Sequence, residues 1–329
     1  MQNRKEAPSF DGRNGLEEIN GDFHGKDIIS LDQFDLPSIE KLIDAVGEIK
    51  TMSDPDRSKL LDYVFVTLFM LEPSTRTRFS FEAAVIQSGG KPQVITAEMF
   101  SNIPTDVILD NYVRYYGIDS DVIVIRHPQV GSANRAAQAT NAIVINGGDG
   151  IGEHPTQALT DLYTIRAHHG RLDNLTGVLT GDMLNGRTVH SLIKGLSLYP
   201  GTSLYLLSEE GLGLSRNDFN QFSDKVKLYE IGDKSEIPPN ADFWYWTRVQ
   251  KERFTNEEEY QRINNRFVVD KKLLKERGSK NMILMHPLPR VGEILPEVDS
   301  DPRAVYFEQA ENGMYVRMAL LSLVLGKIK

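Results

Sequence analysis

Short runs of β-forming residues alternate with longer helix-like stretches, and this alternation restricts the fold more than any other feature of the sequence. Most of these runs are apolar throughout, as expected for strands of a parallel sheet that has helices on both faces. The sequence therefore predicts an α/β fold with two doubly wound parallel-sheet domains joined by interdomain helices. The predicted strands are VFVTLF (64–69), VIVIR (122–126), AIVIN (142–146), GVLTG (177–181), SLYLLS (203–208), VKLYEI (226–231), FWYW (243–246) and MILMH (282–286).

The chain is long for one hydrophobic core, because 329 residues exceed the usual size of a single domain. We expect a flexible N-terminal extension over 1–21, a first domain over 22–153 and a second over 154–304. A C-terminal helix of about 305–329 is expected to pack back on the first domain. The glycine-rich segment 147–150 precedes a helical pattern that can join the two domains.

Composition excludes several classes of protein. The formal charge of −9 disfavours binding to nucleic acid, which needs a basic face. The absence of cysteine rules out disulfides, thiolate metal sites and a cysteine nucleophile, and it fits a reducing, cytoplasmic location. The histidines lack convincing metal-ligand spacing, and no apolar run is long enough to span a membrane. We therefore expect no metal, cofactor, nucleic-acid or membrane partner.

The segment EPSTRTR, at 72–78, follows the first predicted strand and opens a helix. Ser74 is a good N-cap, the apolar residues Phe79, Ala83 and Ile86 follow helical spacing, and Gly89 begins the stop. A helix N-terminus offers free N–H groups and the positive end of a dipole, so this segment can hold a phosphate. Taken alone, the segment is more often a capped helix with solvated arginines than a phosphate site. The groups that would face the phosphate are Ser74, Thr75, Arg76 and Thr77.

Arginines recur after other predicted strands, at Arg126, Arg187, Arg248 and Arg290. Each one alone can be a surface salt-bridge partner. In open α/β sheets, however, ligands bind at the carboxyl ends of strands. Planar guanidinium groups suit phosphate and carboxylate, so we favour a shared, multiply charged ligand.

Two histidine segments, EHPTQ (153–157) and MHPLPR (285–290), add groups for an amide. His154 and Gln157 together can polarise a carbonyl and hold an amide, although a lone buried histidine is commonly structural. The two prolines of the second segment fix an extended backbone, which can aim the carbonyls of Pro287 and Leu288 at a substrate NH2 group.

The combined motifs resemble the catalytic chains of the aspartate/ornithine carbamoyltransferase family, on the aspartate side. Pro287 stands where the ornithine branch typically carries a cysteine. The motifs cover most of residues 22–326 and keep their order: STRTR, RHP, HPTQALTDL, the GDMLNGRTVHSL segment, TRVQKER and HPLPR.

This resemblance implies an enzyme that transfers a carbamoyl group from carbamoyl phosphate to L-aspartate in pyrimidine biosynthesis. It implies a homotrimer with active sites between subunits, and it requires neither metal nor cofactor. The first domain would bind carbamoyl phosphate and the second aspartate. Further assembly with an active or regulatory partner chain is left open.

The resemblance also implies roles for individual residues. Ser74, Thr75, Arg76 and Thr77 would hold the phosphate, with Arg126 bridging phosphate and carbonyl. His154 and Gln157 would hold the carbamoyl end together with backbone groups of Leu288 and Pro289. The catalytic set would be Arg76, Thr77, Arg126 and His154. Arg187, Arg248 and Gln250 would bind aspartate, while Glu72 and Arg253 would help link the domains.

One stretch departs from the family pattern. Family members carry a serine and then a lysine in a loop that enters the neighbouring subunit's site. Here residues 96–117 contain no lysine, and none occurs between Lys91 and Lys194. Ser101 is the candidate for the loop serine. The alternative reading is therefore a weak or inactive homologue that acts as a structural or regulatory subunit. A third reading, a different amine acceptor, is disfavoured because Arg248 and Gln250 suit a dicarboxylate.

Overall fold

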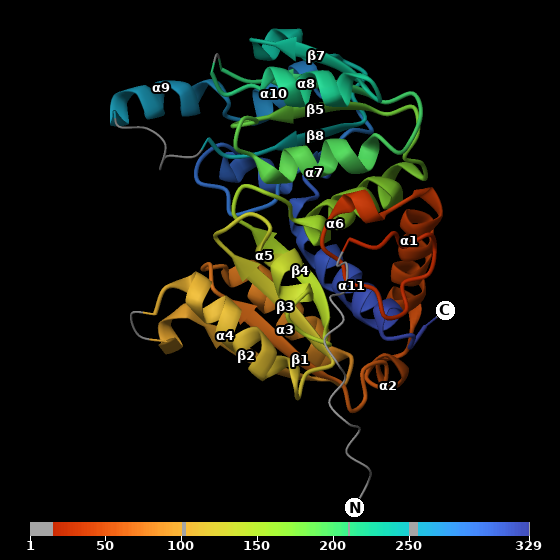
Figure 1. The fold of residues 1–329 in the computed structure, drawn as a ribbon. Coiled ribbons are helices and arrows are strands. Elements are labelled where there is room, and N and C mark those ends of the chain that lie inside the picture. Colours follow the sequence, from red (N-terminus) through yellow and green to blue (C-terminus); the bar gives the residue numbers. More distant parts are fainter. Residues whose placement is uncertain (1–15, 101–102, 210, 250–255, 329) are drawn as a thin grey trace, which may run out of the picture. The chain divides into compact units, whose positions relative to one another are not determined.

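The computed structural model describes residues 16–100, 103–209, 211–249 and 256–328. The chain divides into two compact units. Unit 1 comprises residues 1–156 and 314–329, and unit 2 comprises residues 157–313. Two helices carry the chain between them: α6 (Pro155–His169) begins in unit 1 and continues in unit 2, and α11 (Tyr306–Val324) leads back (Figure 1).

Unit 1 contains a four-stranded parallel sheet in the order β2-β1-β3-β4. The strands form because their β-branched and aromatic residues suit a sheet that is covered on both faces. The strands are β1 (Phe65–Met70), β2 (Lys91–Thr96), β3 (Val122–His127) and β4 (Ile143–Asp149). The helices are α1 (Leu36–Thr51), α2 (Asp54–Arg57), α3 (Thr75–Gln87), α4 (Thr105–Gly117) and α5 (Ser132–Ala137), with 3-10 turns at η1 (Leu31–Gln33) and η2 (Ala97–Phe100).

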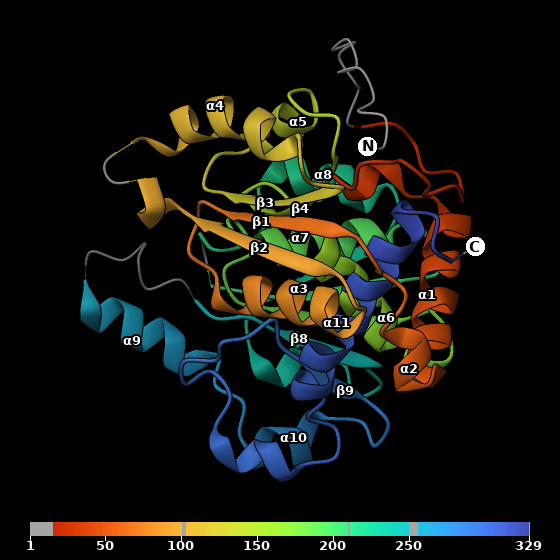
Figure 2. The same cartoon turned by 90° about the horizontal axis from the view of Figure 1, so that it is seen from below.

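Helices cover both faces of this sheet, with α4 and α5 on one side and α3 on the other (Figure 2). Alternate residues of a strand point to opposite faces. Phe69, Ile123 and Ile125 therefore belong to the same buried cluster as Ile108 and Val113 of α4 and the alanines of α5.

Helix α3 begins where the sequence predicts, but it buries a different face. Phe79 is 74% exposed and Ile86 57% exposed, whereas Phe81, Ala84 and Val85 are fully buried. The helix carries apolar residues around much of its circumference, so the spacing alone did not identify the face that packs on the sheet.

Unit 2 contains a five-stranded parallel sheet in the order β7-β6-β5-β8-β9. Its strands are β5 (Thr176–Thr180), β6 (Ser203–Leu207), β7 (Lys227–Ile231), β8 (Phe243–Trp246) and β9 (Ile283–Met285). Its helices, besides most of α6, are α7 (Arg187–Leu196), α8 (Arg216–Ser223), α9 (Glu257–Arg266) and α10 (Lys271–Arg277), with 3-10 turns at η3 (Lys234–Glu236) and η5 (Pro296–Ser300).

The unit 2 sheet is also a middle layer, with α7 and α10 on opposite sides of β8 (Figures 1 and 2). Trp244 and Trp246 of β8 are completely buried and pack in one cluster with Leu273 and Leu274 of α10. The predicted α/β class, with two parallel sheets linked by helices, is therefore confirmed.

Two local predictions need correction. The stretch 96–117 was expected to be a loop, but within its described part a 3-10 turn is followed by the helix α4. Aromatic rings tie this stretch to the sheet: Phe100 lies 6.4 Å from Phe69 and 4.6 Å from Tyr112, measured between ring centroids. Gly147 and Gly148, in the glycine-rich segment expected to lead into the joining helix, lie within β4.

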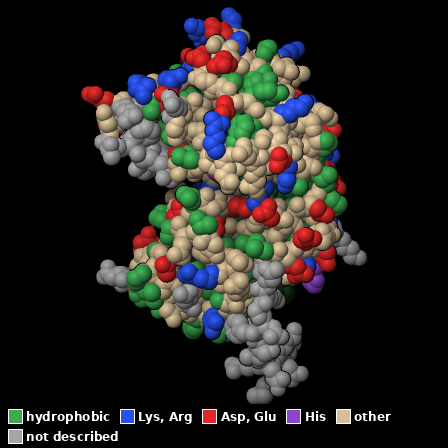
Figure 3. All heavy atoms as spheres, turned by 45° about the horizontal axis from the view of Figure 1, so that its top comes forward, with side chains coloured by type: hydrophobic (Ala, Val, Ile, Leu, Met, Phe, Trp, Pro, Cys, Tyr) green, Lys and Arg blue, Asp and Glu red, His purple; other side chains and the backbone are tan. Residues whose placement is uncertain are grey.

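Charged side chains of both signs are interspersed on the face shown in Figure 3. This mixture agrees with the modest negative charge of the chain. Within the described residues, every helix is too short or too polar to span a bilayer.

Candidate active site

The N-terminus of α3 forms the first part of the candidate site. Ser74 has extended backbone and its hydroxyl accepts a hydrogen bond from Thr77 N at 3.3 Å, as an N-cap does. No acidic residue lies in the first turn. This end of the helix therefore keeps its positive dipole and suits an anion.

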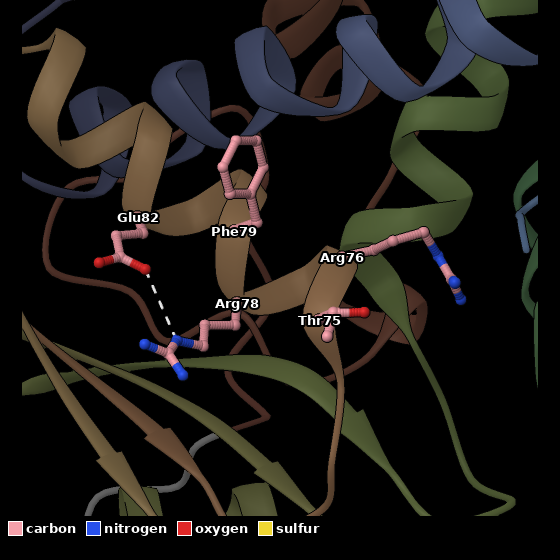
Figure 4. A pocket seen from close by; sticks show the side chains of 5 residues that line it. All are labelled: Thr75, Arg76, Arg78, Phe79 and Glu82. Carbon is pink, nitrogen blue, oxygen red and sulfur yellow. Dashed lines mark ion pairs between the residues drawn. The ribbon is translucent and has the colours of Figure 1, made fainter.

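An open pocket of about 420 Å³ lies along the first turns of α3. It is lined by Thr75, Arg76, Arg78, Phe79 and Glu82. Figure 4 shows that Arg76 extends away from Arg78, whose Nε forms an ion pair with Glu82 at 3.6 Å. The two arginines of this segment therefore have different surroundings.

Arg126 lies at the carboxyl end of β3 and is 6% exposed. Its Nη1 donates to Gly147 O at 3.0 Å, and its Nη2 lies 3.3 Å from Glu72 Oε2. Met70, the last residue of β1, is the register partner of Arg126. The strand-end rule thus brings the guanidinium next to the segment that leads into α3.

His154 follows β4 and is 5% exposed. Its Nε2 lies 3.4 Å from Thr77 Oγ1, and its Nδ1 lies 3.4 Å from Thr156 Oγ1. Gly147 lies close to both β3 and Thr77, because a Cβ at this position would lie 3.1 Å from Ile125 O and 3.4 Å from Thr77 Cγ2. Unit 1 therefore brings together Thr77, His154 and the groups around Arg126.

The turn before His154 is held by a partly buried network of hydrogen bonds. Asp149 Oδ1 accepts from Glu153 N at 2.7 Å, and the carboxylate of Glu153 accepts from Ser30 Oγ at 2.7 Å and from Leu31 N at 2.9 Å. Gly150 has φ of +58°, which favours glycine. These bonds fix the backbone from which the imidazole projects.

His127 is the buried neighbour of Arg126. Burial lowers its pKa, although the nearby Asp106 carboxylate acts in the opposite direction. Gln129 N donates to His127 Nδ1 at 3.0 Å, so the proton of the neutral ring lies on Nε2, 3.7 Å from Asp106 Oδ1. The end of β3 therefore lies close to the first turn of α4.

Unit 2 holds the other predicted groups for the carbamoyl end. Gln157 Nε2 donates to Asp161 Oδ1 at 2.8 Å. Leu288 N donates to His286 Nδ1 at 2.7 Å. Leu288 has φ of +55°, a conformation rare for a leucine, and a cis peptide bond joins it to Pro289.

Arg187 and Arg248 follow neighbouring strands. Arg187 is the first residue of α7, and Arg248 follows β8, which pairs with β5. Thr247 N donates to Thr180 O at 3.0 Å, so the two strands remain joined where these segments begin. Gln250, Arg253 and Ser101 lie outside the described residues.

Arg290 is paired within the chain. Its guanidinium makes a bidentate pair with Asp299, and its Nη1 donates to Tyr306 Oη at 3.0 Å. A carboxylate nine residues further along the chain thus occupies the fork that the sequence assigned to a ligand. Among the described residues, no group of three acidic, histidine or cysteine side chains is arranged to hold a metal ion.

Two family models cover most of the chain. Residues 26–167 match the carbamoyl-P binding domain of aspartate/ornithine carbamoyltransferase, and residues 173–324 match its Asp/Orn binding domain. The chain belongs to the aspartate/ornithine carbamoyltransferase family. The predicted family resemblance is therefore confirmed.

Relatives of this carbamoyltransferase chain span nearly its whole length. It is 39% identical to an aspartate carbamoyltransferase catalytic subunit of Alkaliphilus oremlandii, over 93% of this chain and 92% of that one. It is 42% identical to the catalytic subunit of Thermococcus gammatolerans, over 93% and 99%.

Solved structures agree with the sequence relatives. The catalytic subunit of the M. jannaschii aspartate transcarbamoylase has a TM-score of 0.85 and 35% identity, with 91% of this chain and 98% of that one covered. The Trypanosoma cruzi aspartate transcarbamoylase in complex with carbamoyl phosphate and aspartate has a TM-score of 0.84 and 33% identity, with 94% and 99% covered.

The sequence missed several buried groups of this carbamoyltransferase chain. Asp161 holds Gln157, and its spacing of four residues on a helix was a readable signal. Gln309 and Arg317 come from α11, far along the chain, and only the fold places them beside Asp161 and Thr156 respectively.

Proposed function

We propose that this chain is an aspartate carbamoyltransferase. It transfers the carbamoyl group of carbamoyl phosphate to L-aspartate and yields N-carbamoyl-L-aspartate and phosphate in de novo pyrimidine biosynthesis. The observation that carries the proposal is the contact of the buried His154 with Thr77 at a capped helix N-terminus, in a chain of this family.

The phosphate would bind at the start of α3. Backbone N–H groups and hydroxyls of Ser74, Thr75 and Thr77, together with the guanidinium of Arg76, would hold its oxygens. Arg126 would bridge phosphate and carbonyl. Glu72 Oε2 lies 3.3 Å from Arg126 Nη2 and would help to orient the guanidinium.

The reaction needs orientation and stabilisation of charge. The aspartate amine attacks the carbamoyl carbon, a C–N bond forms, and a tetrahedral oxyanion develops. The bond from carbon to the phosphate oxygen then breaks, and the amine loses a proton as phosphate leaves. His154 and Arg126 would donate to the developing oxyanion. Gln157 and the backbone around Leu288 and Pro289 would hold the carbamoyl NH2.

The aspartate carboxylates would bind Arg187 and Arg248, with Gln250 orienting the amine. This assigns residues 22–153 to carbamoyl phosphate and 154–304 to aspartate, with the helix of 305–329 packed back on the first domain. The descriptions of the two family models support that division of labour.

The proposal includes a homotrimer in the cytoplasm, which could also assemble with an active or regulatory partner chain. The exposed Phe79 and Ile86 on α3 support an interface there, because large apolar side chains at 74% and 57% exposure are suited to burial by another subunit. Light scattering tests the trimer, and Phe79→Ser is expected to weaken it.

Product formation tests the activity. Purified protein given carbamoyl phosphate is expected to carbamoylate L-aspartate and to leave L-ornithine unchanged, as measured by detection of the ureido product. An Arg126→Met variant serves as the control for contaminating enzyme. Absence of product at high enzyme concentration would refute the activity and favour a structural or regulatory role.

Binding can be separated from turnover. A T. cruzi relative was solved with N-(phosphonacetyl)-L-aspartic acid. We expect the same compound to bind this chain and raise its unfolding temperature. A chain that binds this compound but makes no product would be a ligand-binding homologue, whereas a chain that does neither would contradict both readings.

A further inference from the structure

Asp161 is a completely buried carboxylate on α6 that accepts hydrogen bonds from two glutamine side chains. Its Oδ1 accepts from Gln157 Nε2 at 2.8 Å and from Gln309 Nε2 at 2.6 Å. Gln309 lies on α11 and is 1% exposed. Bonds of this length to a charged acceptor in a buried site hold their donors firmly.

The carboxylate fixes which end of the Gln157 amide faces outward. A carboxylate accepts hydrogen bonds and cannot donate them, so the NH2 end of Gln157 turns toward Asp161. Its carbonyl oxygen, Oε1, is therefore at the opposite end of the amide. With that orientation, Gln157 offers an acceptor to a ligand and not a donor.

Gln309 connects Asp161 by hydrogen bonds to a second segment, which contains His286 and Leu288. Its Oε1 accepts from His286 N at 2.8 Å, while its Nε2 is held by Asp161. His286 Nδ1 accepts from Leu288 N at 2.7 Å, so the ring carries its proton on Nε2 and donates to Glu293 Oε1 at 2.7 Å. The backbone at Leu288 is thereby fixed in its unusual positive-φ conformation.

A third buried group lies beside the carboxylate. Tyr245 of β8 is fully buried, and this burial raises its pKa well above the usual value, with a further contribution from Asp161. The phenol therefore stays neutral beside the carboxylate. Asp161 thus accepts from two neutral amides and lies beside a neutral phenol.

We propose that Asp161 is a positioning residue that makes the site selective for a carbamoyl group. Through Gln157 it presents one carbonyl acceptor, and through Gln309 and His286 it fixes the backbone carbonyls near Leu288. Together these acceptors match the two hydrogens of a carbamoyl NH2. The inference rests on the proposed function, because it takes Gln157 and Leu288 as the groups that hold the carbamoyl end.

A purely structural role would give a different result. The same two helices are also joined by Thr164 and Asn312, where Asn312 Nδ2 donates to Thr164 Oγ1 at 3.2 Å. Thr164 is completely buried like Asp161. Thr164→Val therefore removes a link between α6 and α11 without touching Gln157, and it is the matched control.

The test compares two acyl phosphates that differ at one group. Acetyl phosphate has a methyl where carbamoyl phosphate has the NH2, so their ratio of dissociation constants isolates recognition of that group. Calorimetry on the full chain would measure both constants for the wild type, Asp161→Leu, Asp161→Asn, Gln309→Met and Thr164→Val. Because the phosphate is common to both ligands, a general loss of affinity cancels in the ratio.

We expect the wild type to prefer carbamoyl phosphate, and Asp161→Leu to reduce that preference by about tenfold, the effect of one or two lost hydrogen bonds. Asp161→Asn retains an acceptor oxygen and should keep most of the preference. Gln309→Met should fall between them and gives an independent reading if Asp161→Leu does not fold. Thr164→Val should match the wild type.

Other outcomes overturn the inference. An unchanged preference in Asp161→Leu and Gln309→Met would show that the carboxylate only joins helices, as would an equal fall in Thr164→Val. A wild type that binds both ligands equally, or neither, would also overturn it. A wild type that shows the preference but makes no product would refute the proposed activity and leave the inference standing.

Discussion

The hydroxyl of Thr156 lies 3.4 Å from Nδ1 of His154. On its other side, Arg317 Nη2 donates to the same hydroxyl oxygen at 3.4 Å. A guanidinium can only donate, so Thr156 Oγ1 accepts this bond and its own hydrogen remains available for the imidazole. We infer that Thr156 donates this hydrogen to His154 Nδ1, which places the proton of the neutral ring on Nε2, toward Thr77.

This arrangement predicts that Thr156→Val impairs the reaction. The variant keeps the side-chain shape but removes the group that selects the tautomer, so we expect kcat to fall about tenfold with a smaller change in KM. Nitrogen NMR of the His154 ring should show a mixture of tautomers. Thr164→Val is the control, and an unchanged kcat together with an unchanged tautomer would contradict the assignment.

The N-cap of α3 is predicted to serve both folding and phosphate binding. Ser74→Ala should lower the free energy of unfolding by about 1 kcal/mol, the usual value of a lost cap, and should also weaken binding of inorganic phosphate. Ser215→Ala is the matched control, because Ser215 Oγ caps α8 by accepting from Asp218 N at 3.1 Å. The control should lose similar stability in urea unfolding and keep its phosphate affinity. Equal phosphate affinity in Ser74→Ala and Ser215→Ala would show that Ser74 caps the helix but does not bind phosphate.

The α3 segment also shows how far the sequence could predict the fold. Its cap and its start were predictable, because both depend on local chemistry at Ser74. The buried face was not, since Phe79 and Ile86 have the spacing of a core stripe and are nevertheless exposed. Local apolar spacing identifies a helix, but tertiary packing decides which side is covered.

The site was predictable where it depended on strand order and not where it depended on long-range partners. Arg126 follows the strand-end rule and lies beside the segment that opens α3. Arg290 obeys the same pattern, but Asp299 neutralises it. Asp161 and Gln309 are 148 residues apart, so their contact could not be read from sequence spacing.

Restoring a lysine near the start of α4 is predicted to raise turnover. Ile103 is 38% exposed and lies in the stretch that lacks the lysine seen in family members. A positive donor near a developing oxyanion typically contributes about 10²–10³ in rate. A lysine introduced by Ile103→Lys would be less well positioned than a native donor, so we expect kcat to rise by roughly tenfold. Ile103→Gln has similar reach without the charge and serves as the control. If both variants have the same kcat as the wild type, the native stretch does not limit the reaction through a missing charge.

The pair of Arg290 and Asp299 predicts a pH-dependent contribution to stability. The hydrogen bonds from Arg290 lower the pKa of Asp299, and Tyr306 adds to the effect. The folded pKa therefore lies below the unfolded one, so the contribution is present above about pH 4 and is lost as pH falls through the folded pKa. Asp299→Asn should lower the free energy of unfolding by about 1 kcal/mol at pH 7 and should not change it at the acid end. The value at pH 7 is small because the pair is partly exposed.

Urea unfolding across this pH range measures the difference. Asp224→Asn, which removes an exposed carboxylate of unit 2, is the control for loss of charge. A cost that stays constant down to the acid limit would assign the effect to packing and not to the ion pair.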